Sequence, residues 1–172
     1  LATELVQKMP AAEVPEATTG YEGFFHLTNL SGTVERAQLS FIIRDHDRER
    51  FEARKAMLRG LVQGMNAKYG YDALQLTLSD TYYNMREKVE PMMHIIDIAR
   101  EAMEAAGVEP QIKAIRGGTD GAQLSFMGLP CPNIFAGGLY FHGPHELLPV
   151  PNLKKACEVV INIARLTAER YR

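Results

Sequence analysis

Two histidines stand three residues apart in the segment GGLYFHGPHE, residues 137–146. A neutral imidazole is the commonest protein ligand of metal ions, and zinc sites often take one histidine from a loop. The spacing leaves two interpretations open for His142 and His145: a metal-binding loop, or a solvated polar turn. A zinc site normally needs three or more protein ligands. If His142 binds a metal, its partners therefore lie mostly outside this chain.

A second candidate site is the glycine turn RGGTDG, residues 116–121. The guanidinium of Arg116 can bind a carboxylate in a planar fork, and Gly117 and Gly118 let a ligand approach the backbone closely. The structural alternative is an ordinary strand-to-helix turn, with Arg116 as a surface charge and Asp120 as the helix N-cap. The glycine spacing differs from GxGxxG, so a dinucleotide site is not expected.

Arg44 ends the most regular strand pattern in the chain, RAQLSFIIRDH, residues 36–46. It is a candidate for binding a ligand carboxylate, but it could equally be solvated or paired with Asp45 or Asp47. Asn84 lies in the connector that follows residue 80 and could reach a cleft. His26 and His94 fall on a predicted strand and a predicted helix, where structural roles are the simpler interpretation.

Charge and composition exclude several classes of protein. The net charge is −2 with acids and bases interspersed, which argues against a dedicated nucleic-acid binder. No apolar run approaches the ~20 residues of a membrane span. The two cysteines, Cys131 and Cys157, lie in different predicted elements and suggest no disulfide. A reducing, cytoplasmic setting is expected.

The elements that would hold these residues fall into two parts. The first part is predicted to contain helix 1–9, strands 24–35 and 36–46, helix 47–68 and strand 73–80. Gly32 is expected to mark a bulge or turn, and Asp47 to cap the second helix. One further strand at the front would complete the βαββαβ ferredoxin-like unit.

The second part alternates helix and strand, which is typical of parallel α/β structure. The pattern predicts helix 92–107, strand 110–115, a short helix 122–128, strand 132–137 and helix 153–170. Two strands cannot make a doubly wound sheet, so this part is expected to be the end of a larger α/β domain. Such a part would expose apolar surface and be prone to aggregation or pairing.

Four stretches of the chain together resemble the peptidase T family. They are GYEGFFHL, YYNMREKV, IRGGTDGAQLSFMGLPCPNIFAGG and FHGPHE. The family belongs to the dinuclear zinc peptidases and deacylases, and the resemblance runs along essentially the whole chain. It implies an α/β fold built of two pieces. Residues 1–88 would be an α+β ferredoxin-like lid domain without its first strand, and residues 89–172 the C-terminal segment of the zinc-peptidase catalytic domain.

The resemblance also assigns roles to individual residues. It implies that His142, with Glu146 four residues later, binds one of two zinc ions, and that Arg44 and Arg116 hold a substrate carboxylate. Gly117, Gly118 and Asn84 become candidate substrate contacts. The other metal ligands and the general base lie in the N-terminal half of the family pattern, so no catalytic residue is expected in this chain.

The expected function is therefore that of a zinc-dependent tripeptide aminopeptidase, with this chain inactive alone. Tripeptides are the expected substrates, and lid domains are expected to pair in a homodimer. A separate N-terminal half is a further candidate partner. Neither nucleic acid nor membrane is expected as a partner. Two alternatives stay open: a dimerisation module without catalysis, and a related zinc deacylase acting on acylated amino acids.

Overall fold

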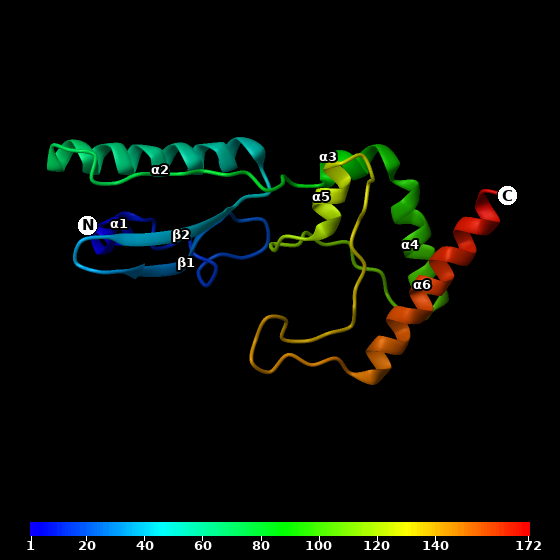
Figure 1. Ribbon diagram of the computed structural model, residues 1–172. Helices are drawn as coiled ribbons and strands as arrows, with labels where there is room; N and C mark the ends of the chain where they lie inside the picture. The colour runs from blue at the N-terminus through cyan, green and yellow to red at the C-terminus, as the bar shows by residue number, and fades with distance from the viewer. The chain divides into compact units, whose positions relative to one another are not determined.

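The computed structural model describes residues 1–172, which form two compact units. Unit 1 comprises Leu1–Asn84 together with Ala114–Gly118, and unit 2 comprises Met85–Lys113 together with Thr119–Arg172. The chain mixes helices with one two-stranded sheet, as expected for an α/β chain (Figure 1). The elements in order are α1 (Ala2–Lys8), β1 (Phe24–Gly32), β2 (Ala37–Arg44), α2 (Arg48–Tyr69), α3 (Arg86–Val89), η1 (Glu90–Met92), α4 (His94–Ala105), α5 (Asp120–Phe126) and α6 (Val150–Arg170).

The sheet of unit 1 is a single antiparallel hairpin. Its register runs from the pair Phe24–Arg44 to the pair Gly32–Ala37, and a bulge interrupts it between Leu27 and Asn29. Gly32 itself stands at the turn, where the Thr33 N–H donates to the Arg36 carbonyl at 2.7 Å. Of the two roles expected for Gly32, the turn is therefore the correct one.

Helix α2 begins and ends where local capping chemistry places it. The Asp47 carboxylate accepts a hydrogen bond from the Arg50 N–H at 2.8 Å, which satisfies one of the free donors of the first turn. Gly70 closes the helix with φ = 74°, a left-handed conformation that costs glycine little. Both ends match the sequence prediction. The helix contributes Leu58, Val62 and Met65 to the core of unit 1, which also contains Leu5, Phe24 and Phe25.

The segment predicted as strand 73–80 is not part of the sheet, which contains β1 and β2 alone. Leu74, Leu76 and Leu78 are half-buried and alternate with exposed residues, so the expected alternation is present. The segment runs beside α2 (Figure 1), where the Asn66 side chain exchanges two hydrogen bonds with the backbone of Leu74, at 2.8 and 2.9 Å. Alternation predicts which side chains are buried. A strand additionally needs a neighbour for its backbone, and the side chain of Asn66 takes that place at Leu74.

Unit 2 is built around the contact between α4 and α6. Ala102 on α4, Ala106 at its C-cap and Val159 on α6 form its buried centre, and the small alanines let the two helices approach closely. Gly107 ends α4 with φ = 68°, as the sequence predicts. The Lys155 ammonium donates to the Ala106 carbonyl at 2.6 Å and so satisfies an acceptor at the end of α4.

Neither of the strands predicted at 110–115 and 132–137 pairs with another segment. Their isoleucines are exposed, Ile112 to 66%, Ile115 to 51% and Ile134 to 37%, whereas Phe135 is half-buried against the core of unit 2. The apolar surface expected on this part of the chain is thus present. A buried parallel strand needs neighbours on both sides, and these two segments have none in this chain.

The N-cap of α5 differs from the one that the sequence predicts. Thr119, and not Asp120, is the N-cap, because its hydroxyl accepts from the Ala122 N–H at 3.3 Å. Asp120 occupies the first helical position, where a negative charge also favours the helix. Gly121 is required here because an added methyl group would collide with the Cys131 carbonyl oxygen.

None of the helices has the length and apolar character needed to cross a membrane. Cys131 and Cys157 both carry free thiols.

Candidate functional site

Arg44 lies at the end of β2 with its guanidinium half-buried and free of any carboxylate partner. Its Nη2 donates to the Tyr82 hydroxyl at 2.9 Å and its Nη1 to the Ile43 carbonyl at 3.2 Å. The guanidinium carbon also lies 5.2 Å from the centre of the Tyr82 ring, within the range of a cation–π contact. Tyr82 therefore holds Arg44 in place while leaving its positive charge uncompensated.

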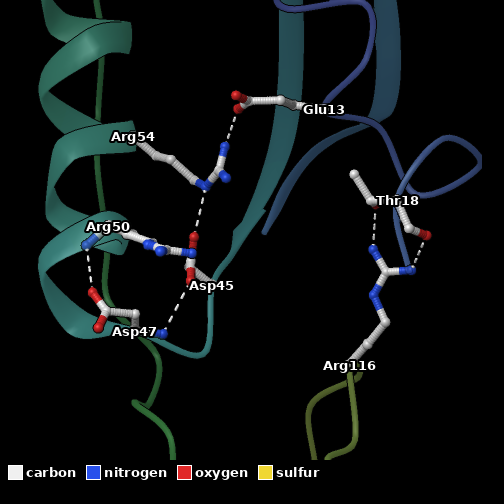
Figure 2. Close-up of polar contacts among 7 residues, drawn as sticks. All are labelled: Glu13, Thr18, Asp45, Asp47, Arg50, Arg54 and Arg116. Carbon is white, nitrogen blue, oxygen red and sulfur yellow. Dashed lines mark hydrogen bonds and ion pairs between the residues drawn. The ribbon is translucent and has the colours of Figure 1, made fainter. Parts of the chain in front are cut away.

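The two acids next to Arg44 are engaged elsewhere, so the ion pair considered as a structural alternative does not form. Asp45 accepts from the Arg54 Nε at 3.0 Å and from the Asp47 backbone N–H at 3.0 Å (Figure 2). Asp47 caps α2 through the Arg50 N–H. Arg54 also pairs with Glu13.

Arg116 is anchored by the loop that precedes β1. Its two terminal nitrogens donate to the backbone oxygen of Thr18, at 2.6 Å, and to the Thr18 hydroxyl (Figure 2). Its guanidinium carbon lies 4.7 Å from the centre of the Phe24 ring. The remaining Nε–H is buried and has no hydrogen-bond partner. A buried donor without an acceptor costs about 1–3 kcal/mol, and no acid of this chain pairs with Arg116.

The two arginines meet in one cluster although 72 positions of the sequence separate residues 44 and 116. Phe24 stands opposite Arg44 in the hairpin and stacks on Arg116. Gly118 lies against Tyr82, because a methyl group added there would overlap the Tyr82 hydroxyl and lie 2.5 Å from its Cζ atom. Arg44, Arg116, Phe24, Tyr82 and Gly118 are called the arginine cluster below. The cluster offers hydrogen-bond donors and positive charge, and this chain places no carboxylate on either arginine, which suits an anionic ligand.

The other two candidate substrate contacts differ from each other. Gly117 faces open space, since an added methyl group would meet no atom within 4 Å. The Asn84 side chain donates to the His46 carbonyl at 3.3 Å. The chain does not itself explain a requirement for glycine at position 117.

His142 lies in a loop of unit 2 that is closed by an antiparallel bridge between Leu139 and Leu147. Its backbone is left-handed, with φ = 64°, and its N–H donates to the Glu146 carboxylate at 2.7 Å. Histidine tolerates this conformation better than bulky residues do, but strained backbone of this kind persists only where the surroundings fix it. Glu146 supplies that fixation, and the imidazole of His142 stays exposed.

The loop presents two exposed imidazoles, those of His142 and His145, as donors for a zinc ion. No group of three or more His, Cys, Asp or Glu side chains in the chain is arranged to hold a metal ion. The exposed imidazole of His142 fits the role of a single ligand, while Glu146 is committed to the loop backbone. A structural or catalytic zinc site takes three or four protein ligands, so this chain alone does not provide one.

Comparison with known proteins gives the relatives of the chain. No family model matches it. It is 61% identical to peptidase T of Parabacteroides distasonis over 169 residues, which cover 98% of this chain and 41% of the relative. Identity to peptidase T of Geobacillus kaustophilus is 54% over 170 residues, with 99% of this chain and 41% of the relative covered. Identity to peptidase T of Vibrio parahaemolyticus is 55% over 171 residues, which cover 99% of this chain and 42% of the relative.

Along nearly its whole length the chain is similar to proteins of the peptidase T family. It spans about two fifths of the length of the curated relatives it matches. Solved structures agree at the level of the fold. An aminopeptidase PepT from Bacillus cereus matches with a TM-score of 0.59 at 20% identity, covering 94% of this chain and 43% of its own. A tripeptidase from Staphylococcus aureus matches with a TM-score of 0.64 at 16% identity, covering 98% and 44%.

Sequence reasoning named both arginines and missed the residues that hold them. Tyr82 was part of a stretch that resembles the peptidase T family, but nothing in its local pattern connects it to Arg44, which lies 38 positions away. Thr18 lies between helix 1–9 and strand 24–35, where the sequence offers no signal that connects it to Arg116. The only signal for Tyr82 in the sequence is its place in the connector that follows residue 80.

Ionisable groups with shifted pKa values lie outside the arginine cluster. Lys55 is buried on α2 and donates to Glu52 at 2.7 Å and to both Asp80 oxygens at 2.9 and 3.0 Å. The hydrogen bonds to Glu52 and then to Asp80 raise the pKa of Lys55. Hydrogen bonds from Lys55 and then Tyr83 lower the pKa of Asp80. This network ties the segment after residue 73 to α2 and is structural.

Proposed function

We propose that a full-length protein containing this chain is a zinc-dependent aminopeptidase that removes the N-terminal residue of tripeptides. The curated relatives at 54–61% identity are named peptidase T, which supports this assignment. The observation that carries the substrate class is the arginine cluster, in which two arginines lack carboxylate partners and one buried Nε–H lacks any partner. A free peptide carboxylate supplies the missing charge and acceptors.

We assign a role to each residue from its chemistry. Arg44 and Arg116 bind the C-terminal carboxylate of the substrate, and Gly118 keeps the Tyr82 ring in contact with Arg44. Gly117 and Asn84 are further substrate contacts. Fixing the carboxylate end sets how many residues of the peptide fit before the scissile bond, which favours a short peptide of defined length.

His142 is proposed as one ligand of a zinc ion whose other ligands lie outside this chain. Zinc bound there would lower the pKa of a bound water toward ~7 and polarise the peptide carbonyl. The contribution of this chain is the imidazole, presented by a loop whose backbone is fixed by Glu146. Residues 1–88 are proposed as the lid domain, residues 89–172 as part of the catalytic domain, and the assembly as a cytoplasmic homodimer.

The assay is product analysis with the purified full-length protein and zinc. Tri-alanine should yield free alanine and di-alanine, and should be hydrolysed faster than di-alanine or N-acetylalanine. Preferred hydrolysis of N-acetylalanine would instead assign the protein as a deacylase, and no hydrolysis of any of the three would favour an interaction module. The 172-residue chain alone should show no turnover with zinc, because no group of three or more of its His, Cys, Asp or Glu side chains is arranged to hold a metal ion.

The metal role of His142 has a test that does not depend on activity. His142→Ala should reduce the zinc bound per protomer, measured by atomic emission after dialysis. His145→Ala, in the same exposed loop, is the matched control and should keep the zinc content of the wild type. Unchanged zinc content in His142→Ala would remove this residue from the metal site.

A further inference from the structure

Tyr82 stands at the centre of the arginine cluster with half of its hydrogen-bonding capacity unused. Its hydroxyl oxygen accepts from Arg44 Nη2 at 2.9 Å, and no acceptor in the chain receives its own proton. A phenol both donates and accepts, so the Tyr82 O–H remains available as a donor. The neighbouring Tyr83 differs, because its hydroxyl donates to Asp80 at 2.9 Å.

The surroundings of Tyr82 fix where this donor lies. The Arg44 guanidinium sits over its ring at 5.2 Å, and the backbone of Gly118 packs against its hydroxyl end. Arg116 lies two positions before Gly118 in the sequence and carries the buried Nε–H that has no hydrogen-bond partner. The unused donors of the cluster therefore come from three different side chains, and neither Asp45 nor Asp47 is available to accept from them.

We propose that Tyr82 is a third carboxylate ligand of the substrate site, donating its phenolic proton to the same carboxylate that Arg44 binds. The inference deepens the proposed function, on which it rests. An oxygen of the incoming carboxylate accepts from the Tyr82 O–H while Arg44 supplies the charge. Tyr82 thereby discriminates a free C-terminal carboxylate from a neutral C-terminal amide, since an amide brings no negative charge for this group of donors.

The test replaces the hydroxyl and keeps the ring. Tyr82→Phe in the full-length protein preserves the ring face beneath Arg44 and removes the donor. Loss of a hydrogen bond to a charged group predicts a KM for tri-alanine raised about tenfold or more. We expect kcat to stay within about twofold and the KM for tri-alanine amide to stay unchanged, since the lost interaction is one of ground-state binding to the carboxylate.

Tyr83→Phe is the matched control, because it removes a hydroxyl from the adjacent residue that binds Asp80. It should leave the ratio of KM for the acid and the amide as in the wild type. An unchanged KM for tri-alanine in Tyr82→Phe, or an equal rise for acid and amide, would overturn the inference.

A binding measurement separates this inference from the proposed function. Titration of tri-alanine into the EDTA-treated full-length protein, followed by calorimetry, requires no hydrolysis. The Kd should rise about tenfold in Tyr82→Phe. If the EDTA-treated wild type binds tri-alanine more tightly than Tyr82→Phe does, but the wild type with zinc does not hydrolyse tri-alanine, the proposed function fails while the role of Tyr82 stands. Equal Kd values for the wild type and Tyr82→Phe refute the role of Tyr82 whatever the activity, and absence of tri-alanine binding by the wild type refutes the carboxylate site itself.

Discussion

Replacing Gly118 with alanine should disable the arginine cluster without touching either arginine. The added methyl group would lie 2.5 Å from the Tyr82 Cζ and would overlap the hydroxyl. Carbon atoms in contact normally stay about 3.5–4.0 Å apart, so the Tyr82 ring must retreat by about 1 Å or more. The 2.9 Å bond between Arg44 and Tyr82 would then stretch beyond hydrogen-bonding distance.

The magnitude follows from the contacts that are lost. A hydrogen bond to a charged group contributes about 1.5–3 kcal/mol, which corresponds to about a 10- to 100-fold rise in KM for a tripeptide. The free energy of unfolding should fall by less, because the atoms that must move belong to the end of a tyrosine side chain. Gly118 is not among the residues with positive φ, so alanine adds no backbone strain of that kind.

Steady-state kinetics with tri-alanine and urea unfolding of the same protein give the two readouts. Gly117→Ala is the matched variant for unfolding, since its methyl group meets nothing within 4 Å. Gly64→Ala, in α2 and also open, is the kinetic control. A KM for Gly118→Ala within about twofold of that of Gly64→Ala would refute the argument that the tight packing of Gly118 positions Tyr82.

Two further predictions concern the network that holds the segment after residue 73. Because the folded-state pKa of Asp80 is lowered, its contribution to stability is present above the unfolded pKa of about 4 and is lost as the pH falls through the folded value. The free energy of unfolding of Asp80→Asn should therefore be lower than that of the wild type at pH 7, and the difference should shrink below about pH 4. The control is Asp72→Asn, which changes an exposed carboxylate without a hydrogen bond and should show no such trend. A difference between Asp80→Asn and the wild type that stays constant down to about pH 2 would contradict the assignment. Asn66→Ala should lower the free energy of unfolding by about 1–3 kcal/mol through loss of its two bonds to Leu74, whereas the exposed neighbour Gln63→Ala should not; equal urea midpoints for the two variants would argue against this anchor.

Features set by neighbouring residues could be predicted from the sequence. The ends of α2 follow from Asp47 and Gly70, because capping involves atoms within one helical turn. The α5 cap was displaced by one residue, from Asp120 to Thr119, since both side chains can accept from the first turn and local pattern does not choose between them.

Features that depend on distant residues could not be predicted in the same way. The alternation of Leu74, Leu76 and Leu78 predicts that their side chains are half-buried, which is correct. It does not predict whether their backbone pairs with a strand, because that depends on which other segments form the sheet. Likewise, Arg44 was a reasonable candidate from its place at a strand end. The sequence does not show that Arg44 and Asp45 form no ion pair. In the structure the Asp45 carboxylate accepts a hydrogen bond from Arg54 instead.

The comparison of tri-alanine with tri-alanine amide in Arg44→Met tests the carboxylate site most directly. Arg44 binds the substrate carboxylate in this account, so Arg44→Met in the full-length protein should lower kcat/KM for the acid at least about tenfold and leave the amide unchanged. Arg36→Met, an exposed arginine of the hairpin turn, should alter neither. An equal loss for the acid and the amide in Arg44→Met would contradict recognition of a carboxylate by the arginine cluster.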